Sequence, residues 1–98
     1  MAIEVQIRRV TKPGTDAKAL LPHIIKLRSH ALAQPGYISG ETLFNLEQPD
    51  ECLVVSRWTT LEHWQNWNRT SQRIKIDESM RDMLGKETEY KIYGVGLW

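Results

Sequence analysis

Six segments with a regular hydrophobic period limit this chain to very few folds. Residues 3–10 alternate between isoleucine or valine and polar side chains, the period of a strand with one buried face. Residues 16–33 instead repeat apolar side chains every three and four positions, the period of an amphipathic helix. The predicted order is strand, helix, strand, strand, helix, strand, over Ile3–Val10, Asp16–Ala33, Tyr37–Leu46, Cys52–Trp58, Gln72–Leu84 and Glu87–Trp98.

Proline and glycine mark the boundaries of the first three elements. Pro22 either kinks the first helix or marks its true start near Leu21, because proline is tolerated in the first turn of a helix. Gly40 indicates a bulge in the second strand or the close approach of another group. A short turn over residues 47–50 joins strands two and three, which predicts a hairpin.

Capping signals place the helices that follow this hairpin. Thr59 and Glu62 have the spacing of a capping box, which predicts a short helix from Thr59 to about Asn68. Ser71 is a second candidate cap, just before the longer helix. Gly85 stands where that helix is expected to stop, since glycine is favoured just past a helix C-terminus.

This order of elements predicts an α+β, ferredoxin-like βαββαβ fold with a four-stranded antiparallel sheet, in one domain spanning residues 1–98. Helices can cover only one face of such a sheet. Strands three and four nevertheless carry apolar residues on both faces, as in Leu53, Val54 and Val55. Because 98 residues leave no second layer to cover the other face, we expect a two-fold homodimer packed sheet to sheet.

Charge and composition exclude several classes of partner. The formal net charge is +1, so no global field attracts nucleic acid or an acidic membrane. No apolar run is long enough for a membrane helix, and the first ten residues lack the apolar stretch of a signal peptide. A single cysteine, Cys52, excludes an internal disulfide and a cysteine-rich zinc site. We therefore expect a cytoplasmic protein that binds neither nucleic acid nor membrane.

Standard catalytic and cofactor motifs are absent from the sequence. The three histidines, His23, His30 and His63, form no metal-binding pair at helical spacing, so we expect no metal site. The sequence has no G-x-S-x-G motif, and Cys52 has no histidine nearby in sequence. The six glycines form no phosphate-binding loop. We therefore expect no bound cofactor.

The most informative segment runs from Trp58 to Trp67. His63 and Trp67 are four residues apart and share one face of the predicted short helix. Trp64 and Trp67 can simply fill the core, as most buried aromatic residues do. Alternatively, Trp67 and His63 wall a pocket, where the indole stacks on a planar ligand and the imidazole accepts a phenolic proton. Arg28, among apolar positions of the first helix, either extends to solvent or binds an anionic group.

Two motifs in the chain resemble those of the antibiotic biosynthesis monooxygenase family. These are Gln34-Pro-Gly-Tyr-Ile-Ser-Gly-Glu-Thr-Leu43 and the spacing Trp58-x-x-Leu61-x-x-Trp64-x-x-Trp67. The resemblance extends over essentially the whole chain. It implies a dimeric α+β barrel with a cavity between sheet and helices, in agreement with the two-sided strands.

The resemblance also implies an activity. One branch of the family oxidises aromatic polyketides or hydroquinones with O₂, without metal or flavin, and the deprotonated substrate itself passes an electron to O₂. Its helix carries an Asn and a Trp four residues apart; Trp67 matches the Trp, and His63 stands at the Asn position. We therefore expect Trp67 to stack on the substrate and His63 to act as base or orienting group. Asn66, Arg73 and Arg28 are the expected substrate-binding neighbours.

Two other functions are open to a chain of this kind. A second branch of the family degrades haem, but of its three positions, at Ile7, Trp67 and Asp77 here, only the Trp is kept, and no histidine follows His63. That departure argues against haem binding. The chain can also be a non-catalytic module that binds a small aromatic ligand or dimerises, because a fold does not determine a function.

Overall fold

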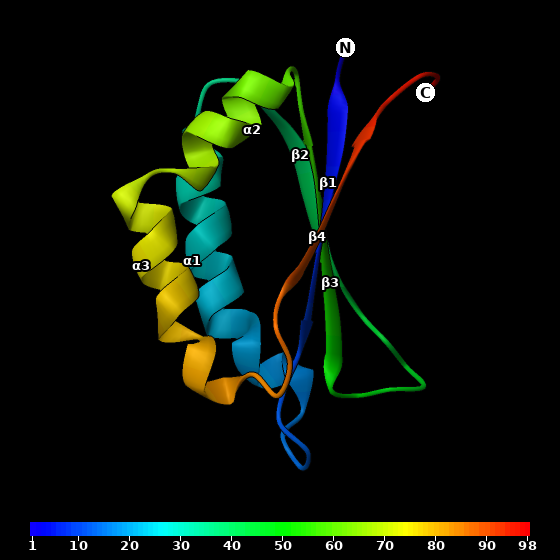
Figure 1. Ribbon diagram of the computed structural model, residues 1–98, viewed down its shortest axis with the longest axis vertical. Helices are drawn as coiled ribbons and strands as arrows, with labels where there is room; N and C mark the ends of the chain where they lie inside the picture. The colour runs from blue at the N-terminus through cyan, green and yellow to red at the C-terminus, as the bar shows by residue number, and fades with distance from the viewer.

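A computed structural model describes residues 1–98 and confirms the ferredoxin-like fold. The four strands form one antiparallel sheet in the order β2-β3-β1-β4. All three helices lie against one face of this sheet, and the other face is uncovered (Figure 1). The elements are β1 (Ile3–Val10), α1 (Leu21–Ala31), β2 (Tyr37–Phe44), β3 (Glu51–Trp58), α2 (Leu61–Asn68), α3 (Ser71–Ser79) and β4 (Glu89–Gly94).

The core lies between the helices and what we call the covered face of the sheet. Strand β1 runs through the middle of the sheet, and its odd-numbered residues Ile3, Val5 and Ile7 are buried on this face. They pack with Trp58 from β3 and with tryptophans of α2 in one apolar cluster. A second cluster gathers at the far end of α1, around Leu20, Cys52 and Met80. No helix is both long enough and apolar enough to cross a membrane.

The first helix follows one of the two alternatives left open for Pro22. A 3-10 turn over Ala17–Leu20 comes first, and the Asp16 side chain caps it by accepting the Lys18 N–H at 2.8 Å. The α-helix proper then begins at Leu21, with Pro22 in its first turn. Pro22 therefore marks the helix start, because the hydrogen bond that its missing N–H would make does not exist there.

The ends of the later helices differ from the prediction. The cap of α2 is Thr60 rather than Thr59, and the cap of α3 is Thr70 rather than Ser71. Helix α3 stops at Ser79, followed by a 3-10 turn over Arg81–Met83, so the predicted extension to Leu84 is wrong. The physical reason is tertiary, since residues 84 and 85 are held against β1.

Gly85 acts differently from the helix stop that was predicted. Its N–H donates to the Val10 carbonyl at 2.9 Å, and Leu84 forms an isolated bridge with Thr11. A side chain at Gly85 would collide with the Thr11 carbonyl, so glycine permits the close approach of the two backbones.

The sheet confirms the hairpin and the close approach at Gly40. Strands β2 and β3 pair antiparallel, and the bulge between them lies between Tyr37 and Ser39 rather than at Gly40. A Cβ at Gly40 would meet the Tyr37 hydroxyl. Strand β4 is shorter than the predicted Glu87–Trp98, and β2 ends at Phe44 instead of Leu46.

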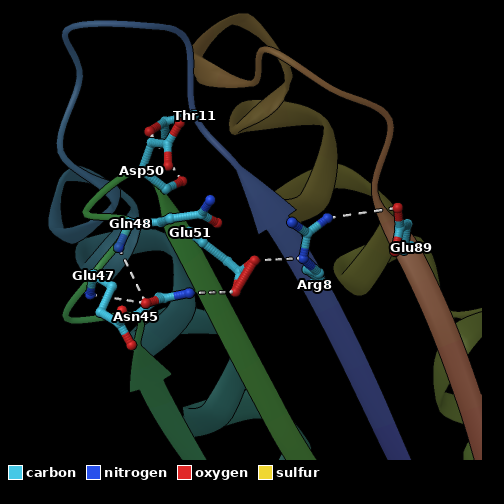
Figure 2. Close-up of polar contacts among 8 residues, drawn as sticks. All are labelled: Arg8, Thr11, Asn45, Glu47, Gln48, Asp50, Glu51 and Glu89. Atoms are coloured by element: carbon cyan, nitrogen blue, oxygen red, sulfur yellow. Dashed lines mark hydrogen bonds and ion pairs between the residues drawn. The ribbon is translucent and has the colours of Figure 1, made fainter.

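The open face of the sheet, which no helix covers, mixes apolar and charged side chains. Alternation along the paired strands places Leu43, Leu53, Val55 and Tyr93 on it. The arginines on this face have carboxylate partners: Arg57 Nη2 lies 3.1 Å from Glu4 Oε1. At one end of the face Arg8 bridges Glu51 and Glu89, at 2.6 and 3.5 Å, and Asn45 donates to the same Glu51 at 3.1 Å (Figure 2).

Candidate functional site

A largely apolar cavity lies between α1, α2, α3 and the covered face of the sheet. Nine of its fourteen lining residues are hydrophobic. The space it encloses is about 50 Å³. Typical ligand pockets measure roughly 300–1,000 Å³, so an aromatic ring can enter only when lining side chains move apart. The residues come from six elements: Ile7, Arg9, Ile24, Leu27, Arg28, Ala31, Tyr37, Gly40, Val54, Ser56, Trp58, Trp64, Trp67 and Arg73.

Four aromatic rings line the cavity. Trp64 and Trp67 come from α2, Trp58 from the end of β3 and Tyr37 from the start of β2. Trp58 meets Trp64 edge to face at 6.0 Å between ring centroids and meets Tyr37 at 5.3 Å. Trp67 is 4% exposed and also belongs to the hydrophobic core. Trp67 is therefore core bulk and cavity wall at once, while its stacking on a ligand stays a prediction.

Two of the predicted substrate-binding residues line the cavity. Arg28 reaches it from α1 and donates from Nη2 to the Thr42 hydroxyl at 2.9 Å. Arg73, from the first turn of α3, donates to the Tyr90 hydroxyl at 3.2 Å and is only 4% exposed. Its guanidinium also lies over the Trp64 ring, 5.3 Å from the centroid, in cation–π geometry. Neither arginine forms an ion pair.

Tyr37 supplies the one phenolic hydroxyl among the lining residues. Burial raises the pKa of this phenol above its ordinary value, and the nearby Arg28 charge opposes that rise only in part. Tyr37 is therefore protonated at neutral pH and can donate a hydrogen bond to an oxygen atom in the cavity. It is not suited to act as the base.

The other two predicted site residues, His63 and Asn66, do not line the cavity. His63 Nδ1 lies 2.8 Å from the Thr59 hydroxyl and 2.9 Å from the Thr60 hydroxyl, at the start of α2. Asn66 is on the exposed face of α2 and accepts a hydrogen bond from the Arg69 side chain at 2.8 Å. The structure thus brings Trp67, Arg73 and Arg28 together and leaves His63 and Asn66 outside this group.

His63 instead contacts the turn that leads from α1 into β2. Gly36 in this turn has φ +84°, and a Cβ there would overlap the imidazole ring. The Thr59 N–H donates to the Gly36 carbonyl at 2.8 Å, which ties the start of α2 to the same turn. Tyr37 is the next residue. His63 therefore packs against the segment that carries the tyrosine lining the cavity.

Sequence reasoning missed Arg9, a cavity residue on β1. Arg9 is 1% exposed, and its Nη2 lies 2.8 Å from Asp77 Oδ1 on α3. The sequence does contain a signal that Arg9 is buried. Arg9 is odd-numbered like Ile3, Val5 and Ile7, so alternation along the strand directs its side chain to the same face as theirs. An arginine in that register is a charge directed into the core.

No three histidine, cysteine, aspartate or glutamate side chains lie close enough together to hold a metal ion. The positions that the haem-degrading branch uses are also occupied differently here. Ile7 offers only an apolar side chain to the cavity, and the Asp77 carboxylate is engaged by Arg9. These residues do not fit a haem bound in that manner.

Comparisons with known proteins agree with this architecture. Residues 2–78 match the family model described as antibiotic biosynthesis monooxygenase. A conserved protein from Methanosarcina mazei Go1 is 24% identical, with a TM-score of 0.85 over 95% of this chain and 91% of that one. SnoaB, a cofactor-independent oxygenase from Streptomyces nogalater, is 9% identical, with a TM-score of 0.86 over 99% and 95%. Rv0793 from Mycobacterium tuberculosis is 12% identical, with a TM-score of 0.83 over 96% and 94%. No curated protein matches by sequence.

Proposed function

The chain belongs to the antibiotic biosynthesis monooxygenase family, and from this membership we propose that it oxidises a small aromatic, hydroquinone or polyketide-type substrate with O₂, without a cofactor. The observation that carries the proposal is the cavity itself. Three tryptophans, one protonated tyrosine and positively charged side chains surround a single apolar space. Flat rings favour a planar ligand, and fixed positive charges favour a ligand that ionises.

The proposed chemistry needs no electron carrier. The substrate loses a proton, and its anion gives one electron to O₂, which leaves a substrate radical and superoxide. Their recombination and a second proton give a hydroperoxide. Loss of water then converts a CH₂ group into a carbonyl, so that the substrate plus O₂ yields a ketone plus H₂O. The step that the protein must assist most is the first, because an anion is unstable in an apolar cavity without compensating charge.

Arg73 and Arg28 are the residues we assign to that first step. Each lines the cavity, and each donates to a neutral hydroxyl rather than to a carboxylate. A positive charge within a few ångströms lowers the pKa of a phenol or enol, because it stabilises the ionised form. Trp67 provides the wall on which the ring stacks, as the sequence motif suggests. With the anion stabilised in this way, the proton can leave to water.

His63 remains in the proposal as an orienting residue rather than as the base. Its ring contacts the Gly36 turn and its Nδ1 is engaged by two threonine hydroxyls, so it acts on the cavity through Tyr37. We expect His63→Ala to lower kcat/KM without changing the shape of its pH profile. A base would instead remove the acid limb of that profile when mutated.

The proposal includes a two-fold homodimer formed through the open face. Leu43 and Tyr93 on this face are nearly half exposed, so large apolar side chains on both outer strands are left for a partner to cover. The paired charges beside them can be buried at lower cost than isolated ones. A second copy of the chain offers the same surface, as a two-fold interface requires.

One observation favours a second function, a non-catalytic ligand-binding module. The cavity is small, and the tryptophans that line it also fill the core. A protein that only binds an aromatic ligand needs the same wall and the same charges. Such a module would bind aromatic ligands saturably without consuming oxygen.

Oxygen uptake distinguishes the two functions. The purified, metal-free protein is assayed with naphthohydroquinones and anthrone-like phenols, against protein-free controls for autoxidation. We expect uptake above the control, with kcat/KM at least tenfold lower in Trp67→Phe and Arg73→Met. Arg81→Met, in the turn after α3 with its side chain 75% exposed, is the matched control and is expected to stay within twofold of wild type. Saturable binding without uptake, or equal rates in all variants, would reject the monooxygenase proposal.

A further inference from the structure

The cavity carries more positive charge than the proposed reaction uses. Three arginines, Arg9, Arg28 and Arg73, line it, and no acidic residue does. The one carboxylate that contacts any of them is Asp77, which pairs with Arg9 from outside the lining. Two formal positive charges, on the buried Arg73 and the half-buried Arg28, thus have no acidic partner beside an apolar space. Such an arrangement is unfavourable unless an anion or water occupies it.

Arg9 is the residue with the largest unmet hydrogen-bonding capacity. A guanidinium has five N–H donors and no acceptor. In Arg9 only Nη2 finds a partner, the Asp77 carboxylate, while Nε and Nη1 are buried without any. A buried charged donor without a partner is costly, and proteins rarely retain one without a use. The free donors of Arg9 therefore indicate an acceptor that the protein chain does not provide.

The charge of these donors favours an ionised acceptor, because hydrogen bonds between ionised groups are the strongest. The two free nitrogens do not form one bidentate fork, since the N–H parallel to that of Nε belongs to Nη2, which Asp77 holds, and Nη1 lies on the other side of the guanidinium. The limited space of the cavity favours a planar carboxylate over a bulkier tetrahedral anion such as phosphate. Ile7, Val54 and the tryptophans supply apolar contact for the rest of a ligand.

We propose that the cavity binds planar aromatic carboxylates and that Arg9 is the residue that anchors the carboxylate group. Arg9 then determines specificity at one end of the ligand, and Arg73 and Arg28 face the hydroxyl that ionises. This inference rests on the proposed function for the identity of the ionising group. The carboxylate site itself does not depend on any oxidation.

The test measures binding of ligands that cannot be oxidised, so that it is independent of turnover. The probes are benzoate and 2-naphthoate, each compared with its neutral amide of the same shape. Binding is followed by quenching of tryptophan fluorescence, since three of the four tryptophans line the cavity, and by calorimetry. We expect at least one carboxylate to bind tenfold or more tighter than its amide.

Arg9→Met is the decisive variant, and Arg8→Met is its matched control. Arg8 is the preceding residue of the same strand, but its side chain lies on the open face with Glu51 and Glu89. We expect Arg9→Met to reduce the preference for carboxylate to less than threefold while amide affinity is unchanged. Arg8→Met should keep the full preference. Where Arg9→Met alone is unfolded by circular dichroism, Arg9→Met/Asp77→Leu replaces it, because this pair leaves no unpartnered carboxylate.

The outcomes separate this inference from the proposed function. Carboxylate preference lost in Arg9→Met supports the inference even if no substrate consumes oxygen. Oxygen uptake with neutral hydroquinones, together with equal affinity for acid and amide, would overturn the inference and leave the monooxygenase proposal standing. No saturable binding of either carboxylate, or a preference that survives the Arg9 substitutions, would overturn it as well.

Discussion

Arg8 and Arg9 are neighbours on β1, yet they lie in opposite environments. Arg8 points to the open face, where it bridges two glutamates and is one-third exposed (Figure 2). Arg9 points to the covered face, where it is 1% exposed and has a single carboxylate partner. One residue along a strand reverses the side chain's direction. The comparison shows that the same side chain is neutralised on one face and left with free donors on the other.

The difference extends to the two faces as a whole. On the open face Arg8 and Arg57 both have glutamate partners. On the covered side Arg28 and Arg73 have only hydroxyl partners and aromatic rings. Surface charge pairs contribute little to stability and often serve solubility or assembly. Charges kept without acidic partners beside an apolar cavity need another explanation, and binding of an anion is the one we propose.

The largest expected difference between the faces concerns their aromatic residues. Trp67→Ala removes a buried ring from the core and should lower the free energy of unfolding by about 3–5 kcal/mol. Tyr93 is 49% exposed in the single protomer, so Tyr93→Ala should lower protomer stability by no more than about 1 kcal/mol and act mainly on the proposed dimer. Urea unfolding followed by circular dichroism measures both. Equal losses at the two positions would mean that the open face is already part of a core.

Charging the open face tests its assembly. Val55 lies in the middle of β3, paired with Gln6 on one side and Glu41 on the other. In a two-fold dimer Val55→Glu introduces two like charges into one interface, so we expect dimer dissociation to become at least a hundredfold more favourable, or about 2.7 kcal/mol. Sedimentation equilibrium provides the measurement, with Ile25→Glu on the exposed side of α1 as control. A wild-type chain that sediments as a monomer would contradict the dimer.

Removing the acidic partner of each arginine sharpens the comparison. Asp77→Asn leaves the buried Arg9 without a countercharge, which should cost about 2 kcal/mol, somewhat below the usual range because Asp77 itself is 30% exposed. Glu51→Gln breaks a partly exposed pair and should cost less than about 1 kcal/mol. The two variants are compared by urea unfolding at pH 7. A smaller loss for Asp77→Asn would show that Arg9 does not depend on Asp77.

The smallest expected effect is a pH dependence confined to the open face. The Asn45 hydrogen bond and the Arg8 guanidinium hold the pKa of Glu51 below its ordinary value of 4.5. Because the folded-state pKa is the lower one, the Glu51 contribution is fully present above pH 4.5 and is lost as pH falls through the lowered pKa. Urea unfolding between pH 3 and 7 should therefore show a flatter acid limb in Glu51→Gln than in wild type. Superimposable profiles would contradict this assignment.

The regular elements could be predicted because their signals are local. The alternation of apolar and polar residues predicted β1 with its observed bounds. The tolerance of proline in the first turn of a helix allowed the observed start of α1 at Leu21. The ends of α3 and β4 could not be predicted, because contacts of Leu84 and Gly85 with β1 decide where the chain leaves the helix. The caps shifted by one residue, since adjacent threonines or serines offer equivalent hydroxyls to the same turn.

The candidate site was predictable in part for the same reason. Helical spacing correctly placed Trp64 and Trp67 on the buried side of α2. The same spacing put His63 beside Trp67, but the threonine hydroxyls at the start of the helix engage its ring instead. Arg73 was predicted to bind substrate from the family resemblance, and Arg28 from its apolar neighbours on the first helix. Arg9 was missed because a charged residue at the end of a strand is ordinarily assigned to solvent.

The sequence by itself determined the order of the elements, the side of the sheet that each strand residue faces, and the helix faces that are buried. These properties depend on periods of two and of about 3.6 residues, which any chain with this pattern would share. Only the tertiary structure decided which charges are neutralised. Arg8 meets Glu51 from 43 positions away, and Arg9 meets Asp77 from 68 positions away. No local rule relates such distant residues, because their contact depends on how β3 and α3 pack against β1.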